Sequence, residues 1–179
     1  MDLFRRVRAS PRLGPRLLLA LGLMLAAPAT GDAAGKSGDK PTVRELSAAW
    51  WQWALSIPAS VNPLGDPTGA LCGVGQHGGV WFLGGTLDGS PAERSCKVPA
   101  GTAIFFPVIN AECSVIEDPS LQDRAALRAC AKGFMDLVTT ADAEVDGRPV
   151  KVVRARSALF AITLPPGDVL GIVGNPDKS

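Results

Sequence analysis

The chain has 179 residues, of which 46% are hydrophobic, and a formal net charge of +1. This near-neutral balance excludes the strong basic footprint that binding to nucleic acid or to an anionic membrane surface needs. The length is that of one ordinary domain, long enough to form a hydrophobic core.

Residues 1–34 have the organisation of a cleavable secretory signal peptide. A stretch with five arginines ends at Arg16, an apolar run fills residues 17–27, and small residues follow, with plausible cleavage after Ala29 or Ala33. The apolar run is shorter than the roughly 20 residues of a spanning helix. We therefore expect a secreted or periplasmic protein with no stable membrane anchor after cleavage. Removing this segment leaves 13 basic and 15 acidic residues, a net charge of −2.

All four cysteines lie in the part that we predict to be exported. An even number of cysteines in an oxidising compartment predicts disulfides. Four cysteines allow three pairings, and we favour the two most local ones, Cys72–Cys96 and Cys113–Cys130. Zinc sites usually contain closely spaced cysteine or histidine pairs, and the chain has no C-x-x-C motif and a single histidine. We therefore predict neither a bound metal nor a cofactor.

The domain is predicted to begin with a helix that follows a flexible leader over residues 35–41. Thr42 is the expected N-cap, and Glu45 stands three residues later at the spacing of a capping box. Pro58 is expected to end the helix. Trp51 lies off the apolar stripe, which consists of Val43, Leu46, Trp50, Trp53 or Ala54, and Ile57.

The rest of the chain alternates short apolar strands with one more helix. Asp118 is the expected N-cap of that helix, with Pro119 in its first position. Asp146-Gly147 predicts a tight hairpin turn. We therefore predict a mainly β fold with one or two helices over residues 42–179, an antiparallel β-sandwich or jelly-roll-like α+β domain. The expected strands cover residues 80–83, 102–109, 143–145, 150–153 and 160–164.

Five unusual segments stand out by their aromatic, glycine and cysteine content. They are WWQWALSIP at 50–58, CGVGQHGGVWFL at 72–83, CKVPAG at 96–101, FFPVINAEC at 105–113 and SALFAITLP at 157–165.

Together these segments resemble a family of secreted bacterial proteins with no established function. The resemblance covers most of residues 43–165 and implies a secreted, β-rich domain. Members of that family continue beyond the point that corresponds to Ser179 with a further glycine-rich strand pair. The resemblance therefore implies that this chain is truncated at its C-terminus.

Four residues are weak candidates for a functional site. His77 in a glycine-rich loop could act as a general base or a metal ligand, or be an exposed loop residue. Glu112 could act with Glu117 as a catalytic carboxylate pair, although acidic residues before a helix also have a structural role. Trp51 could stack on a sugar, or pack in the core with its neighbours. Asn110 could contact a ligand or fix the turn after its strand.

These observations favour a non-enzymatic secreted module, stapled by disulfides, that binds an unknown extracellular ligand or has a structural role. The alternative is a secreted hydrolase of an extracellular polymer, with His77 and Glu112 as its catalytic residues. A hydrolase needs titratable groups that converge in a pocket. A binding module needs an exposed aromatic or apolar patch.

Overall fold

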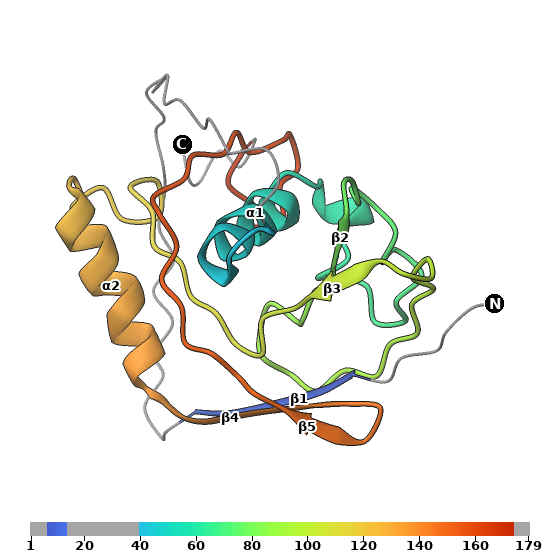
Figure 1. The fold of residues 1–179 in the computed structure, drawn as a ribbon. Helices are drawn as coiled ribbons and strands as arrows, with labels where there is room; N and C mark the ends of the chain where they lie inside the picture. The colour runs from blue at the N-terminus through green and yellow to red at the C-terminus, as the bar shows by residue number, and fades with distance from the viewer. Residues whose placement is uncertain (1–6, 14–39, 174–179) are drawn as a thin grey trace.

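A computed structural model describes residues 7–13 and 40–173 and has an α+β fold (Figure 1). The apolar run and the cleavage sites of the predicted signal peptide lie outside the described residues. The elements are strand β1 (Val7–Leu13), helix α1 (Val43–Leu55), the short 3-10 helix η1 (Ala59–Val61), strands β2 (Val80–Phe82) and β3 (Ala103–Phe105), helix α2 (Arg124–Asp136), and strands β4 (Val138–Val145) and β5 (Arg148–Val150).

Helix α1 begins as the sequence predicts. The backbone N–H of Glu45 donates to Thr42 Oγ1 at 3.3 Å, and the Glu45 carboxylate accepts from the Thr42 N–H at 2.7 Å. These reciprocal bonds form the predicted capping box. The bonds that the Thr42 N–H and hydroxyl donate to the Glu45 carboxylate lower the pKa of Glu45. The helix ends at Leu55, before Pro58, because Ser56 caps it by donating its N–H to Gln52 O.

The core lies between α1 and the β2–β3 pair. Trp50 and Trp53 are 3% and 2% exposed, and Phe82 of β2 lies 5.7 Å from the Trp53 ring. Phe105 of β3 packs edge-on against Phe82. The predicted stripe is thus buried over its C-terminal half, whereas Val43 at its start is exposed. The remaining buried members of this cluster are Ala54, Ile57 and Leu64.

Strands β2 and β3 pair in parallel, with Val80 opposite Ala103 and Phe82 opposite Phe105. Our expectation of antiparallel pairing was wrong here. Parallel strands need a crossover connection of about a dozen residues or more, which the 83–102 segment supplies. This segment is pinned by the Cys72–Cys96 disulfide, whose Cα atoms are 5.8 Å apart.

The second sheet is antiparallel and has the strand order β1-β4-β5. The predicted hairpin turn joins β4 and β5, and Asp146 and Gly147 both have positive φ, at 54° and 73°. The described residues thus form a parallel pair of strands and a three-stranded antiparallel sheet, and they do not show the predicted sandwich or jelly roll.

Two further elements differ from prediction. Helix α2 begins at Arg124 and not after Asp118, because the Asp118 carboxylate accepts from the Ser120 N–H at 2.9 Å and so closes a turn. Asp123 is the N-cap instead and accepts from the N–H groups of Ala125 and Ala126. The predicted strands are the second difference: residues 151–153 and 160–164 belong to no sheet, and of the predicted strand 102–109 only Ala103–Phe105 is paired.

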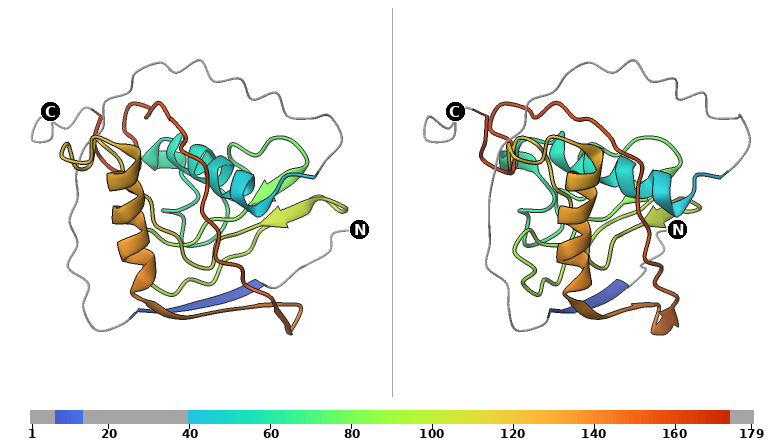
Figure 2. Two further views of the ribbon diagram at one scale, coloured as in Figure 1. Left: turned by 60° about the vertical axis from the view of Figure 1, so that its left-hand side comes forward. Right: turned by 90° about the vertical axis from the view of Figure 1, so that its left-hand side faces the viewer.

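Helix α2 stands to one side of the molecule with the three-stranded sheet at its foot (Figure 2). The disulfide Cys113–Cys130 ties it to the loop after β3, with Cα atoms 6.1 Å apart. Both cysteine pairs therefore match the predicted connectivity. The segment after β5 runs alongside α1, where the Gln52 side chain donates to Ala161 O at 3.1 Å.

Candidate functional site

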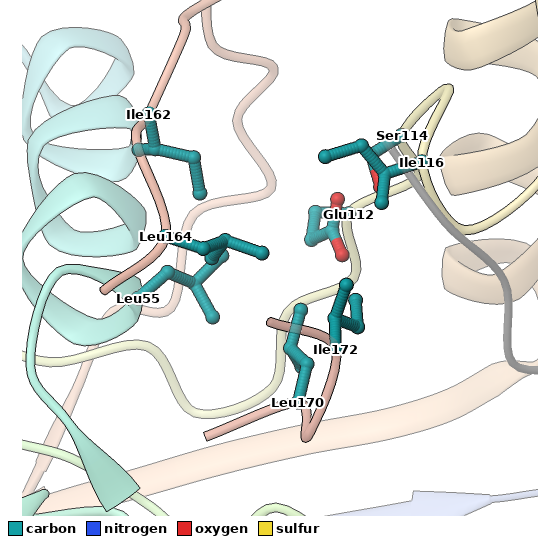
Figure 3. Close-up of a pocket in the computed structure, with 8 residues that line it drawn as sticks. All are labelled: Leu55, Glu112, Ser114, Ile116, Ile162, Leu164, Leu170 and Ile172. Atoms are coloured by element: carbon teal, nitrogen blue, oxygen red, sulfur yellow. The ribbon is translucent and has the colours of Figure 1, made fainter. Parts of the chain in front are cut away.

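The best-defined polar group in an apolar setting is the carboxyl of Glu112, in the loop between β3 and α2. It lines a small, partly open hollow. Figure 3 shows Leu55 of α1 and two residues of the extended segment, Ile162 and Leu164, across the hollow from Glu112. The other lining residues are Ser114, Ile116, Leu170 and Ile172. The disulfide at Cys113 holds this loop in place.

Burial among these apolar side chains raises the pKa of Glu112 to about 9. A hydrogen bond to Glu117 and the charge of that carboxylate add to the shift. Glu117 in turn accepts from Ser114 Oγ at 2.6 Å, and Ser114 is only 4% exposed. At neutral pH, Glu112 is therefore a protonated acid that donates to the Glu117 carboxylate.

This arrangement limits the chemistry that the acid pair can perform. Glycosidase carboxyls are roughly 5 Å or more apart, which leaves room for the sugar and the attacking water. Glu112 and Glu117 are instead hydrogen-bonded to each other. With Ser114 they form a closed polar chain that fixes the loop, and the hollow beside them has room only for a small group.

His77 does not join this site. Its ring is exposed, its Nδ1 lies 2.8 Å from the Gly75 carbonyl oxygen, and it is not among the residues that line the Glu112 hollow. Its neighbour Gln76 has the structural role in this loop. The Gln76 side chain donates to Phe82 O at 2.7 Å and accepts from the Phe82 N–H at 2.9 Å, which fixes the loop to β2.

The tryptophans of α1 serve mainly the core. Trp50 Nε1 donates to Leu83 O at 2.9 Å, and Trp53 Nε1 donates to Val74 O at 3.0 Å. Trp51 is half-buried and edge-on against Trp50, with ring centroids 5.0 Å apart. A stacking platform for sugars would thus rest on Trp51 alone.

Asn110 is half-buried in the loop after β3. Two buried polar residues that the sequence analysis missed, Asn62 and Asp66, lie between η1 and β2, and a third, Asp168, lies near the end of the described chain. Asn62 is 1% exposed, and Asp66 accepts from the Leu71 and Thr68 N–H groups, which lower its pKa to about 2. Arg94 donates to the carbonyl oxygens of Leu64, Gly84 and Gly85.

Exposed apolar side chains occur at the C-terminal end of α2, in β5 and in the segment that follows β5. No residue of helix α2 is fully buried, and Arg154 donates to Asp136 at 2.7 Å, which holds the segment after β5 beside the end of α2. Hydrogen bonds from Lys132 and Arg154 lower the pKa of Asp136. We call this region the α2–β5 surface. Its five side chains are each more than a third exposed: Phe134, Leu137, Val150, Val152 and Val153.

Comparisons with protein-family models, curated proteins and solved structures found no match for this chain. Within residues 7–13 and 40–173, no three side chains of His, Cys, Asp or Glu gather as metal ligands would. No helix in the described part of the chain is long and apolar enough to cross a membrane. Function must therefore be inferred from the chemistry of these residues.

Proposed function

We propose that this chain is an exported, disulfide-bonded module that binds a protein partner and performs no catalysis. The α2–β5 surface carries this proposal. A 13-residue amphipathic helix normally buries its apolar face, yet on α2 Leu127 and Cys130 are only half-buried and Phe134 is exposed. The hydrogen bond from Arg154 to Asp136 brings the exposed valines after β5 near the exposed end of α2, and such apolar surfaces are typical of protein-binding sites. The two disulfides and the N-terminal pattern of basic and apolar residues support export.

The placement of the candidate catalytic residues also supports a binding role. The alternative function needs His77 and Glu112 to reach a common reacting atom. The His77 ring forms a hydrogen bond with Gly75 O in its own exposed loop, whereas the Glu112 carboxyl forms one with Glu117 at the hollow. Trp50 and Trp53 give no stacking platform for a sugar, because both are buried and donate their indole N–H groups within the core.

The proposal can be tested with an apolar dye, anilinonaphthalene sulfonate, added to the oxidised exported protein. We expect the native protein to bind the dye below its melting temperature, and the double variant Phe134→Ser/Val152→Ser to lose most of that binding. Leu87→Ser is the matched control, because Leu87 is 53% exposed and lies in the loop after β2. Native protein that binds no dye, or loses dye binding equally in the control, would contradict the proposal.

A second candidate function, hydrolysis of an extracellular polymer, is favoured by one observation. A carboxylic acid kept protonated at neutral pH can serve as a general acid, and burial does this to Glu112. The test is product release from a panel of insoluble polysaccharides and proteins. Activity that Glu112→Gln abolishes and the exposed-site control Glu93→Gln preserves would establish this function over the binding role.

A further inference from the structure

One edge of β4 is paired along its whole length by β1. The register runs from Val7 opposite Val145 to Leu13 opposite Val138, with one irregularity between Arg12 and Leu13. Residues 7–13 belong to the segment that we assign to the signal peptide. The strand that completes this sheet is therefore one that export would remove.

Removal of β1 would leave β4 almost unpaired. Its other neighbour, β5, pairs with only three of its residues, Ala143–Val145. An open strand edge presents a row of backbone N–H and C=O groups that readily pair with another extended chain. Strand β4 contains no proline, so each of its residues can donate an N–H. The outer strands β1 and β5 each carry a proline, as edge strands can.

The residues of this edge indicate what it would accept. Asp142 and Glu144 are both exposed, and they stand opposite Ser10 and Arg8 of β1 in the register. Opposite charges at facing positions of an antiparallel pair stabilise it, and like charges destabilise it. A second copy of β4 would bring the same acidic residues from both chains into one pair of strands. A strand with basic residues fits the edge better.

We propose that in the exported protein the β4 edge binds an extended segment of a partner protein that places a basic residue opposite Glu144. This rests on the export and the protein binding proposed above. The partner segment adds a strand antiparallel to β4, in the position that β1 holds in the full chain. Backbone hydrogen bonds supply the affinity, and the acidic side chains select the sequence. Release of β1 by cleavage makes the site available only after export.

The test uses the protein recovered after export of the full chain, with its N-terminus determined by mass spectrometry. The probe is a fluorescent synthetic peptide of residues 7–13, VRASPRL, and binding is measured by anisotropy. We expect saturable binding, and about fivefold weaker binding for a peptide with Arg8→Glu. Because this change lies in the peptide, it leaves the folding of the protein untouched.

A charge exchange makes the test specific for Glu144. In the protein, Glu144→Lys should weaken binding of the unchanged peptide and strengthen binding of the Arg8→Glu peptide. The control Glu93→Lys makes the same charge change on an exposed loop outside the sheet and should leave both affinities unchanged.

Three results would overturn the proposal. In the first, the exported protein retains residues 7–13. In the second, the affinity for the peptide does not change with the charge of the residue at position 144. In the third, the exported protein forms a stable dimer that the peptide cannot dissociate. The first would remove the export on which the proposal rests. The last would assign the edge to a second copy. Loss of dye binding in Phe134→Ser/Val152→Ser reports on the α2–β5 surface, and the charge exchange at Glu144 reports on the β4 edge, so failure of the binding function is recognised separately.

Discussion

The side-chain amide of Asn62 donates to the backbone carbonyl of Ala54 at 2.8 Å and thereby closes the end of helix α1. The same NH2 group donates to Ile57 O at 2.8 Å, while Asn62 Oδ1 accepts from the Leu64 N–H at 2.9 Å. Carbonyl groups in the last turn of a helix have no partner within the helix. One buried amide therefore links α1 to the turn that leads into the core.

We predict that Asn62→Ala lowers the free energy of unfolding by about 3 kcal/mol. The substitution leaves buried carbonyl and N–H groups without partners, and each such group costs about 1–3 kcal/mol. Urea denaturation of the oxidised protein measures the change. The control Ser60→Ala, at an exposed position two residues away, should change stability by less than about 0.5 kcal/mol. Equal effects of the two substitutions would contradict this role for Asn62.

The acid pair predicts a pH dependence of stability. The folded state raises the pKa of Glu112 from 4.5 to about 9. Because the folded state holds this proton more tightly than the unfolded state, the contribution of Glu112 to stability is complete below pH 4.5. It falls as the pH rises and is lost by about pH 9. Denaturation midpoints measured from pH 5 to 9 should therefore decline.

The variant Glu112→Gln isolates that contribution, because a glutamine amide can donate to Glu117 without titrating. We expect this variant to decline less between pH 5 and 9 than the parent protein. For Glu93→Gln, at an exposed loop position, the denaturation midpoint should fall between pH 5 and 9 as much as it does for the parent protein. If Glu112→Gln declines as steeply as the parent, Glu112 does not titrate within this range.

The features that were predictable from the sequence are those that local spacing decides. The capping box needs only Thr42 and Glu45 three residues apart, and the hairpin needs only Asp146-Gly147. The start of α2 was not decided locally, because two aspartates can each act as an N-cap. Asp118 closes a turn with Ser120, and Asp123 caps the helix. The parallel pairing of β2 with β3 likewise depends on how the 83–102 connection folds.

The sequence indicated which acidic residues form the site, but not that one of them has a raised pKa. Glu112 and Glu117 are close in sequence, so a carboxylate pair was foreseeable. The raised pKa of Glu112 requires an apolar environment, and Ile162, Leu164, Leu170 and Ile172 come from a segment about 50 residues later. Nothing in the local sequence indicates that this segment folds back over the loop. His77 is the single histidine of the chain, yet it is Gln76 beside it that makes the hydrogen bonds to β2.

The attachment of α2 gives a third prediction. Since the apolar face of this helix is only half-buried, the Cys113–Cys130 disulfide should be its main anchor. Cys113→Ala/Cys130→Ala should lower the free energy of unfolding by about 3 kcal/mol. It should also speed hydrogen exchange across residues 124–136. The control pair Cys72→Ala/Cys96→Ala should loosen the 66–79 loop and leave exchange in α2 unchanged. If the amides of α2 exchange as slowly without the Cys113–Cys130 disulfide as with it, the disulfide is not the main anchor of this helix.

The glycine-rich loop offers a prediction with a control inside the same loop. Gly75 and Gly78 both have positive φ, at 67° and 79°, so alanine at either position should cost about 1 kcal/mol in backbone strain. A Cβ at Gly75 would also lie 2.9 Å from Ile57 Cδ1 and 3.2 Å from Trp53 Cδ1, whereas a Cβ at Gly78 would meet nothing within 4 Å. Gly75→Ala should therefore destabilise the protein by about 1–3 kcal/mol more than Gly78→Ala, because overpacking displaces core side chains. Thermal or urea unfolding of the two variants measures the difference. If the two variants lose the same free energy of unfolding, the Ile57 side chain can move to accommodate the added methyl group. Only the backbone conformation would then require glycine at position 75.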